Sequence, residues 1–192
     1  MTKKCSTKKG TFQSGFSINV RLNNLAETGR LQFFYHSPRS KYPVRDVTNE
    51  QGQGWKLEPH IEKNAENYYD ECYQNNIVPF LCSDEKYLFL FTNCKNGNTY
   101  RGKQVIVGYI VKENGFQRPN KDGGGFHYAV QGDTKLFSFK DAFPLERLVQ
   151  SKVRMKKCSA EETKTILNHF KGKENILTMC INEINRLERD IL

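Results

Sequence analysis

The sequence predicts an α+β protein built on a small curled β-sheet or barrel, with flanking helices and a helical C-terminus. Short segments rich in β-branched and aromatic residues follow one another between residues 77 and 140, which is typical of a densely connected sheet. After Pro144 the pattern changes to two segments with helical periodicity. We therefore expect a disordered basic arm over 1–13, a sheet domain over 14–150, and a helical extension over 151–192 that packs on this domain.

The first 75 residues predict two strands, a long loop and a helix. Apolar and polar residues alternate strictly across 15–22, which indicates a half-buried strand, and 31–37 is a second strand candidate. Residues 38–59 are polar, include two glycines and hold the only tryptophan, so we expect a long loop. Residues 62–75 carry a modest apolar stripe that predicts a helix.

The central part of the chain predicts five strands in close succession. They are expected over residues 77–82, 86–92, 104–112, 126–131 and 134–140. The segments "NKDGGG" and "QGDT" separate the last three and contain glycine, asparagine and aspartate, which are turn-forming residues. This density of strands favours a curled sheet or a small barrel.

The C-terminal part predicts two helices. Ser159 to Glu162 has the sequence of a capping box and opens a helix that should end near Gly172. A second helix follows over 174–192. Its apolar stripe consists of Leu177, Ile181, Ile184, Leu187 and Ile191. Such a stripe either packs on its own domain or mediates dimerisation or docking of a protein partner.

The chain is basic, with a formal net charge of +9, which favours polyanionic partners because Lys and Arg displace counterions from phosphates. Residues 1–10 and 151–158 each contain four basic residues and no acidic ones, although solvated surfaces explain such runs equally well. No apolar run approaches the length of a membrane span, and the N-terminus lacks the apolar segment of a secretory signal. We expect a cytoplasmic protein without a membrane partner, whose six scattered cysteines are reduced.

Catalytic motifs do not emerge from the sequence. It contains no GxSxG, Walker-type loop, HExxH or GxGxxG after a strand, and neither the four histidines nor the cysteines have metal-ligand spacing. We therefore expect no cofactor and no metal. The alternative is a metal-dependent nuclease or another nucleic-acid-processing enzyme that uses Asp46, Glu58 and Glu62, but these carboxylates fall in a loop and a helix start rather than on adjoining strands.

Nucleic-acid binding is favoured over catalysis because aromatic residues repeatedly adjoin polar or basic ones. Aromatic faces stack on unpaired bases, and cations outside the pocket contact phosphates. Trp55 lies in a polar, glycine-flanked loop rather than in an apolar periodic segment, so it is the first candidate for a base-binding pocket. Further pocket candidates are Tyr35, His36, Tyr128 and Tyr109, each of which can equally be a core residue. The candidates for phosphate binding are Arg101, Lys103, Lys121, Lys156 and Lys157.

Residues 77–150 resemble the PUA-like superfamily, which includes the EVE, ASCH and YTH domains. The resemblance consists of an aromatic strand ending in a small polar residue, a turn, a strand with an Ile-Val-Gly-aromatic pattern, and a proline-associated segment. These places are held by Phe91-Thr92-Asn93, Ile106-Val107-Gly108-Tyr109 and Phe143-Pro144-Leu145. The resemblance implies a small barrel that binds RNA, or reads modified bases in DNA or RNA, in an aromatic pocket at its side.

The resemblance also implies a setting, because several PUA-like proteins are fused to or encoded beside restriction and defence enzymes. The leading hypothesis is thus a nucleic-acid-binding module that recognises a modified or flipped base, and its expected setting is a restriction or defence system. A protein-interaction module of a larger defence complex, which docks through the C-terminal helix, is the remaining alternative.

Overall fold

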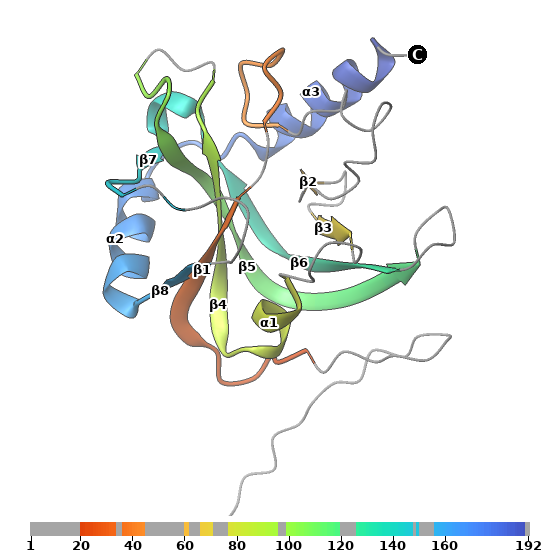
Figure 1. Ribbon diagram of the computed structural model, residues 1–192, viewed down its shortest axis with the longest axis vertical. Helices are drawn as coiled ribbons and strands as arrows, with labels where there is room; N and C mark the ends of the chain where they lie inside the picture. Colours follow the sequence, from red (N-terminus) through yellow and green to blue (C-terminus); the bar gives the residue numbers. More distant parts are fainter. Residues whose placement is uncertain are drawn as a thin grey trace, which may run out of the picture.

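Among the residues that this computed structural model describes, eight strands form one twisted sheet, and three α-helices pack on it (Figure 1). The described residues are 20–33, 36–44, 60–61, 66–70, 77–95, 99–119, 126–147, 149 and 156–190. The predicted α+β class is therefore confirmed.

The sheet is mixed and open. Its strands are β1 (Ala26–Phe33), β2 (His60–Ile61), β3 (Glu66–Asp70), β4 (Glu85–Asn93), β5 (Gln104–Pro119), β6 (Phe126–Leu136), β7 (Phe143–Pro144) and β8 (Lys156–Cys158). Their order is β2-β3-β6-β5-β4-β1-β8, with β7 paired to the start of β5. Strands β1 and β4 are parallel, whereas the other pairs are antiparallel. Because β2 and β8 end this path, the described strands form a curled sheet and not a closed barrel.

Strand β4 shows how the sequence builds a core on both faces of the sheet. Successive side chains of a strand point to opposite faces. Leu88 and Leu90 belong to one apolar cluster, to which α1 (Ile77–Cys82) and α3 (Leu177–Arg189) contribute. Phe89 and Phe91 belong to a second cluster, which α2 (Ala160–Phe170) covers. The central strand is consequently buried on both sides, and its sequence is almost continuously apolar.

Helix α2 begins as its sequence predicts. The Ser159 hydroxyl accepts a hydrogen bond from the Glu162 N–H, and the Glu162 carboxylate accepts one from the Ser159 N–H, which completes the capping box. The helix ends before Gly172, which has a positive φ of 77°. Near this end the Phe170 ring stacks on Phe137, with 4.1 Å between the ring centroids. Helix α2 is thereby fixed to the sheet at its C-terminal end.

Helix α3 packs on its own chain through the predicted apolar stripe. Ile184 and Leu187 are 5% and 4% exposed, and Cys180 adds a third buried side chain. Leu177 is partly buried against the same cluster, whereas Ile191 lies outside the described residues. None of the described helices is both long and apolar enough to cross a membrane.

Three predicted elements are wrong. Residues 77–82, predicted as a strand, form α1, and residues 66–70, predicted within a helix, form β3. The "QGDT" segment, predicted as a turn, lies inside the continuous strand β6. Of the predicted strand 15–22, residues 20–22 are described and are not in a strand.

Candidate nucleic-acid interface

One end of the sheet gathers basic side chains from three segments that are distant in sequence. These segments are the loop 36–44, the end of β4 with the following turn (93–95 and 99–103), and residues 138–142 around a 3-10 helix (Phe139–Asp141). We call this surface the basic end. Its described residues include Arg39, Lys41, Lys95, Arg101, Lys103 and Lys140, all of which are exposed. Asp141 is its one described acidic residue, and its carboxylate accepts a hydrogen bond from the Ser138 hydroxyl.

The β4–β5 turn is held by backbone hydrogen bonds, so its charged side chains project from a fixed base. Cys94 N–H donates to the Lys103 carbonyl, and Gly102 N–H donates to the Cys94 carbonyl, each at 2.8 Å. Gly102 has a φ of +81°, a conformation that costs little only for glycine. Arg101 and Lys103 flank this glycine and point to solvent as the sequence predicts for turn residues.

The loop 36–44 is joined to this turn through buried polar residues. His36 is fully buried, and its Nε2 lies 2.9 Å from the Lys95 backbone nitrogen and 3.0 Å from the Asn93 carbonyl oxygen. Its ring also packs against Phe139, with 4.9 Å between centroids. The Ser37 N–H donates to the Val44 carbonyl and closes the loop at its base. His36 thus links the three segments. It belongs to the first, contacts the backbone of Asn93 and Lys95 in the second, and packs on Phe139 in the third.

Gln104 holds a further segment beside the turn. Its side-chain amide pairs with the backbone of Val149, donating from Nε2 to the carbonyl at 2.9 Å and accepting the N–H at Oε1 at 2.6 Å. The Leu145 N–H donates to the Gln104 carbonyl. Arg147, which is exposed, and Glu146 lie on the stretch between these two contacts. This stretch therefore borders the basic end.

Most cations of the basic end are not neutralised within the described part of the chain. No described acidic residue forms an ion pair with Arg39, Arg101, Lys103 or Lys140. Glu183 of α3 lies close enough to Lys41 to be affected by it: the pKa of Glu183 is lowered chiefly by its hydrogen bond with Arg186, with a smaller effect of Lys41. The basic end therefore carries a net positive charge that is available to a ligand.

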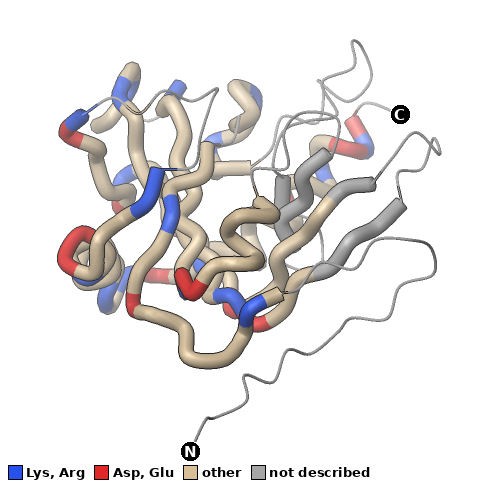
Figure 2. The backbone as a smooth tube through the Cα atoms, turned by 60° about the horizontal axis from the view of Figure 1, so that its bottom comes forward, with Lys and Arg blue, Asp and Glu red and all other residues tan. Residues whose placement is uncertain are grey.

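Lys156 and Lys157, the other described phosphate candidates, belong to a different part of the molecule. They lie on β8, and Lys157 is 3.9 Å from Glu85 at the start of β4, whereas Arg101 and Lys103 follow the end of β4. The two ends of a nine-residue strand are about 26 Å apart. Lys156 also pairs with Glu162 at 3.7 Å. The predicted phosphate contacts thus do not form one patch, and Lys121 lies outside the described residues. Lys and Arg occur on most elements, with acidic residues among them (Figure 2).

Two of the three described candidates for the base pocket are core residues. His36 and Tyr128 are 0% and 7% exposed, so neither presents a face on which a base can stack. Tyr109 is half-buried among the rings of Tyr87, Phe89, Phe137 and Phe170. Burial raises the pKa of its hydroxyl. The burial of His36 and Tyr128 argues against these two assignments, that of Tyr109 stays a prediction, and Trp55 and Tyr35 lie outside the described residues.

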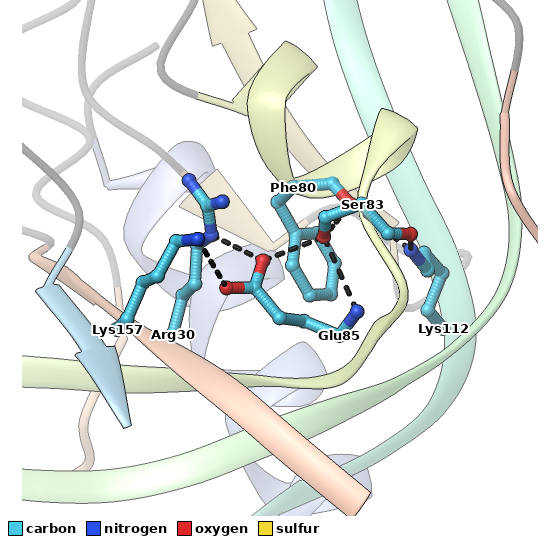
Figure 3. Close-up of polar contacts among 6 residues, drawn as sticks. All are labelled: Arg30, Phe80, Ser83, Glu85, Lys112 and Lys157. Carbon is cyan, nitrogen blue, oxygen red and sulfur yellow. Dashed lines mark hydrogen bonds and ion pairs between the residues drawn. The ribbon is translucent and has the colours of Figure 1, made fainter. Parts of the chain in front are cut away.

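At the start of β4 a cluster of mostly buried charged and polar side chains connects neighbouring elements (Figure 3). Arg30 of β1 pairs with Glu85 of β4, and the Ser83 hydroxyl donates to the same carboxylate. Lys112 is 3% exposed, and its Nζ donates to the carbonyls of Phe80 and Ser83, both at 2.9 Å. Since every partner belongs to the chain itself, the cluster is an internal link between β1, β4, β5 and α1 and not an open site.

Nothing in the described residues suggests metal or thiol chemistry. No group of three or more His, Cys, Asp or Glu among them can hold a metal ion, and Asp46, Glu58 and Glu62 lie outside them. The described cysteines are free. Burial raises the pKa of the Cys158 and Cys180 thiols to about 12, so neither is a thiolate at neutral pH.

Sequence reasoning found Arg101 and Lys103 but missed the rest of the basic end. Arg39 and Lys41 lie in "SPRSKYP", where alternating basic and turn-forming residues were a usable signal. The role of His36 had no local signal, because Asn93 and Lys95, whose backbone groups it contacts, are more than 50 residues away in sequence. No protein-family model, curated protein or solved structure matches the sequence.

Proposed function

We propose that this protein binds nucleic acid and that the basic end provides its phosphate contacts. The proposal rests on one observation: exposed cations from three segments converge at one end of the sheet, and no described acidic residue forms an ion pair with four of them, which are Arg39, Arg101, Lys103 and Lys140. Phosphate oxygens pair with such cations, and counterion release then drives association.

The PUA-like assignment remains part of the proposal. Its three motifs lie side by side, since Phe91 pairs with Ile106 across β4 and β5, and Ile106 pairs with Phe143 of β7. This arrangement supports a common structural unit, although the described sheet is open. The proposal assigns recognition of a modified or flipped base to Trp55 and, secondly, to Tyr35, because the candidates His36 and Tyr128 are core residues.

Salt dependence of binding tests the phosphate contacts. A short fluorescent oligonucleotide is titrated with wild-type protein, with R101A/K103A and with K156A/K157A between about 50 and 200 mM salt. Each double variant removes two positive charges, but at opposite ends of β4. We expect R101A/K103A to weaken binding and to reduce the log–log salt slope by about 2, because two phosphate contacts are lost.

The control variant K156A/K157A is expected to keep the wild-type slope. Equal losses in both double variants would show that binding follows net charge and not the basic end. Absence of any salt-dependent binding by the wild type would refute the proposed function itself.

A further inference from the structure

A single buried imidazole, that of His36, contacts all three segments of the basic end. His36 is 0% exposed and lies under the segments that carry the exposed cations. Its ring contacts Phe139 beside Lys140, while its nitrogens face backbone groups of Ser37, Asn93 and Lys95. A buried polar ring in such a position needs hydrogen-bond partners, since leaving them unmade costs roughly 1–3 kcal/mol.

The contacts of the two ring nitrogens indicate which nitrogen carries the proton and which accepts a hydrogen bond. Nδ1 is 3.1 Å from the Ser37 carbonyl oxygen, and this contact is a hydrogen bond only if Nδ1 carries the proton. Full burial opposes a charged ring. The Lys95 backbone N–H donates to Nε2 at 2.9 Å, which requires a lone pair on that nitrogen and so places the proton of the neutral ring on Nδ1. In this tautomer the Asn93 carbonyl oxygen, 3.0 Å from Nε2, is a close contact and not a hydrogen bond.

We propose that His36 is the positioning residue for the phosphate contacts of the basic end: by accepting the Lys95 N–H, it holds the β4–β5 turn against the loop 36–44. This inference rests on the proposed function. Arg39 and Lys41 on the loop, and Arg101 and Lys103 on the turn, then face one phosphate backbone together. Without this hydrogen bond the turn and the loop are not held in register, so one or two of their phosphate contacts are not made, which lowers both the affinity and the salt slope.

Two variants separate the hydrogen bond from the aromatic packing. H36F keeps a ring against Phe139 but has no acceptor, whereas H36Q has an amide oxygen that can accept the Lys95 N–H. We expect H36F to bind the fluorescent oligonucleotide about tenfold more weakly, with a salt slope reduced by about 1 to 2. H36Q is expected to restore the wild-type slope. Circular dichroism confirms at each salt concentration that the variants are folded.

The wild-type protein gives a readout that needs no folded variant. Nitrogen-15 spectra of the imidazole should show a protonated Nδ1 and an unprotonated Nε2, and the Lys95 amide should be protected from hydrogen exchange. A protonated Nε2, or an unprotected Lys95 amide, overturns the inference.

The outcomes distinguish this inference from the proposed function. If the wild type binds with a steep salt slope and H36F keeps that slope, the positioning role is refuted while the proposed function stands. If H36Q loses the slope as H36F does, an acceptor at this position is not what positions the turn, and the inference is again refuted. If the wild type shows no salt-dependent binding, the proposed function fails first.

Discussion

At the scale of single residues, buried polar side chains are matched to backbone groups at the ends of secondary-structure elements. His36 contacts the end of β4, and Lys112 donates two hydrogen bonds to carbonyls at the end of α1. The Lys112 ammonium also lies over the Phe80 ring, 4.7 Å from its centroid. Burial lowers the pKa of Lys112 from 10.5 to about 8, although Glu85 acts in the opposite direction. Burial therefore destabilises the charged form of Lys112 in the folded protein.

The lowered pKa of Lys112 predicts that its contribution to stability depends on pH. Between pH 8 and 10.5 the unfolded chain binds the proton more tightly than the folded protein, so stability rises with pH in this window. We expect the difference in unfolding free energy between wild type and K112M to shift in favour of the wild type by up to about 3 kcal/mol across it. Urea denaturation at several pH values measures this difference.

A control variant removes an exposed lysine from the same protein. K164M, on the outer side of α2, should show no change in its difference from the wild type over the same range. A flat or falling difference for K112M would mean that Lys112 is not destabilised by burial.

At the scale of elements, local patterns succeeded where one side chain or one hydrogen bond decides the structure. The capping box at Ser159 is one example, and the almost continuously apolar strand β4 was likewise predicted from its own residues. Residues 77–82 failed because a short apolar run fits a buried strand and a buried helix equally. Pro79 was an available signal, since proline is tolerated in the first turn of a helix but disfavoured within a strand.

The long-range parts of the fold and of the site could not be predicted from local sequence. "QGDT" has turn residues, yet it pairs along β5, where an irregularity between Lys112 and Asn114 accommodates Gly132. Arg101 and Lys103 were identified because exposure of a turn is a local property. The burial of His36 and Tyr128 could not be predicted in this way, because it depends on packing against elements that are distant in sequence.

The position of Gly132 predicts a strong requirement for glycine within β6. A Cβ there would lie 1.6 Å from the Val111 carbonyl oxygen, and this backbone atom cannot move without breaking the β5–β6 pairing. We expect Gly132→Ala to destabilise the protein by about 3 kcal/mol or more, measured by urea denaturation. Gly102→Ala is the comparison: its Cβ meets no atom within 4 Å, so only the positive φ costs energy, about 1 kcal/mol. Equal effects would contradict the close approach at Gly132.

At the scale of the whole molecule, the two apolar clusters share the same sheet, and the C-terminal helices complete both. Helix α2 contributes Ile166 and Phe170 to one cluster, and α3 contributes Ile184 and Leu187 to the other. Removal of either helix would expose apolar surface on the central strands, at roughly 25 cal/mol for each Å². The helices are thus integral to the core of the sheet.

This arrangement predicts one cooperative unfolding transition. Leu187→Ala, at a position 4% exposed, should lower the unfolding free energy by about 2–5 kcal/mol. The transition monitored by helical circular dichroism and that monitored by aromatic absorbance should remain superimposed. Met179→Ala on the same helix, at a position 43% exposed, should change stability by less than about 0.5 kcal/mol. An early, separate loss of helix in Leu187→Ala would show that α3 folds as an independent unit.

The pairing of β1 with β8 has a consequence for how the protein is made. Residues Gly29–Leu31 have β4 on one side, and they gain their other neighbour only when residues 156–158 have been synthesised. During translation an unpaired backbone edge therefore stays open to other nascent chains on the same polysome. In the folded protein β8 covers this edge, and its residues Lys156 and Lys157 are charged side chains of the kind that disfavour pairing of an edge strand with another chain.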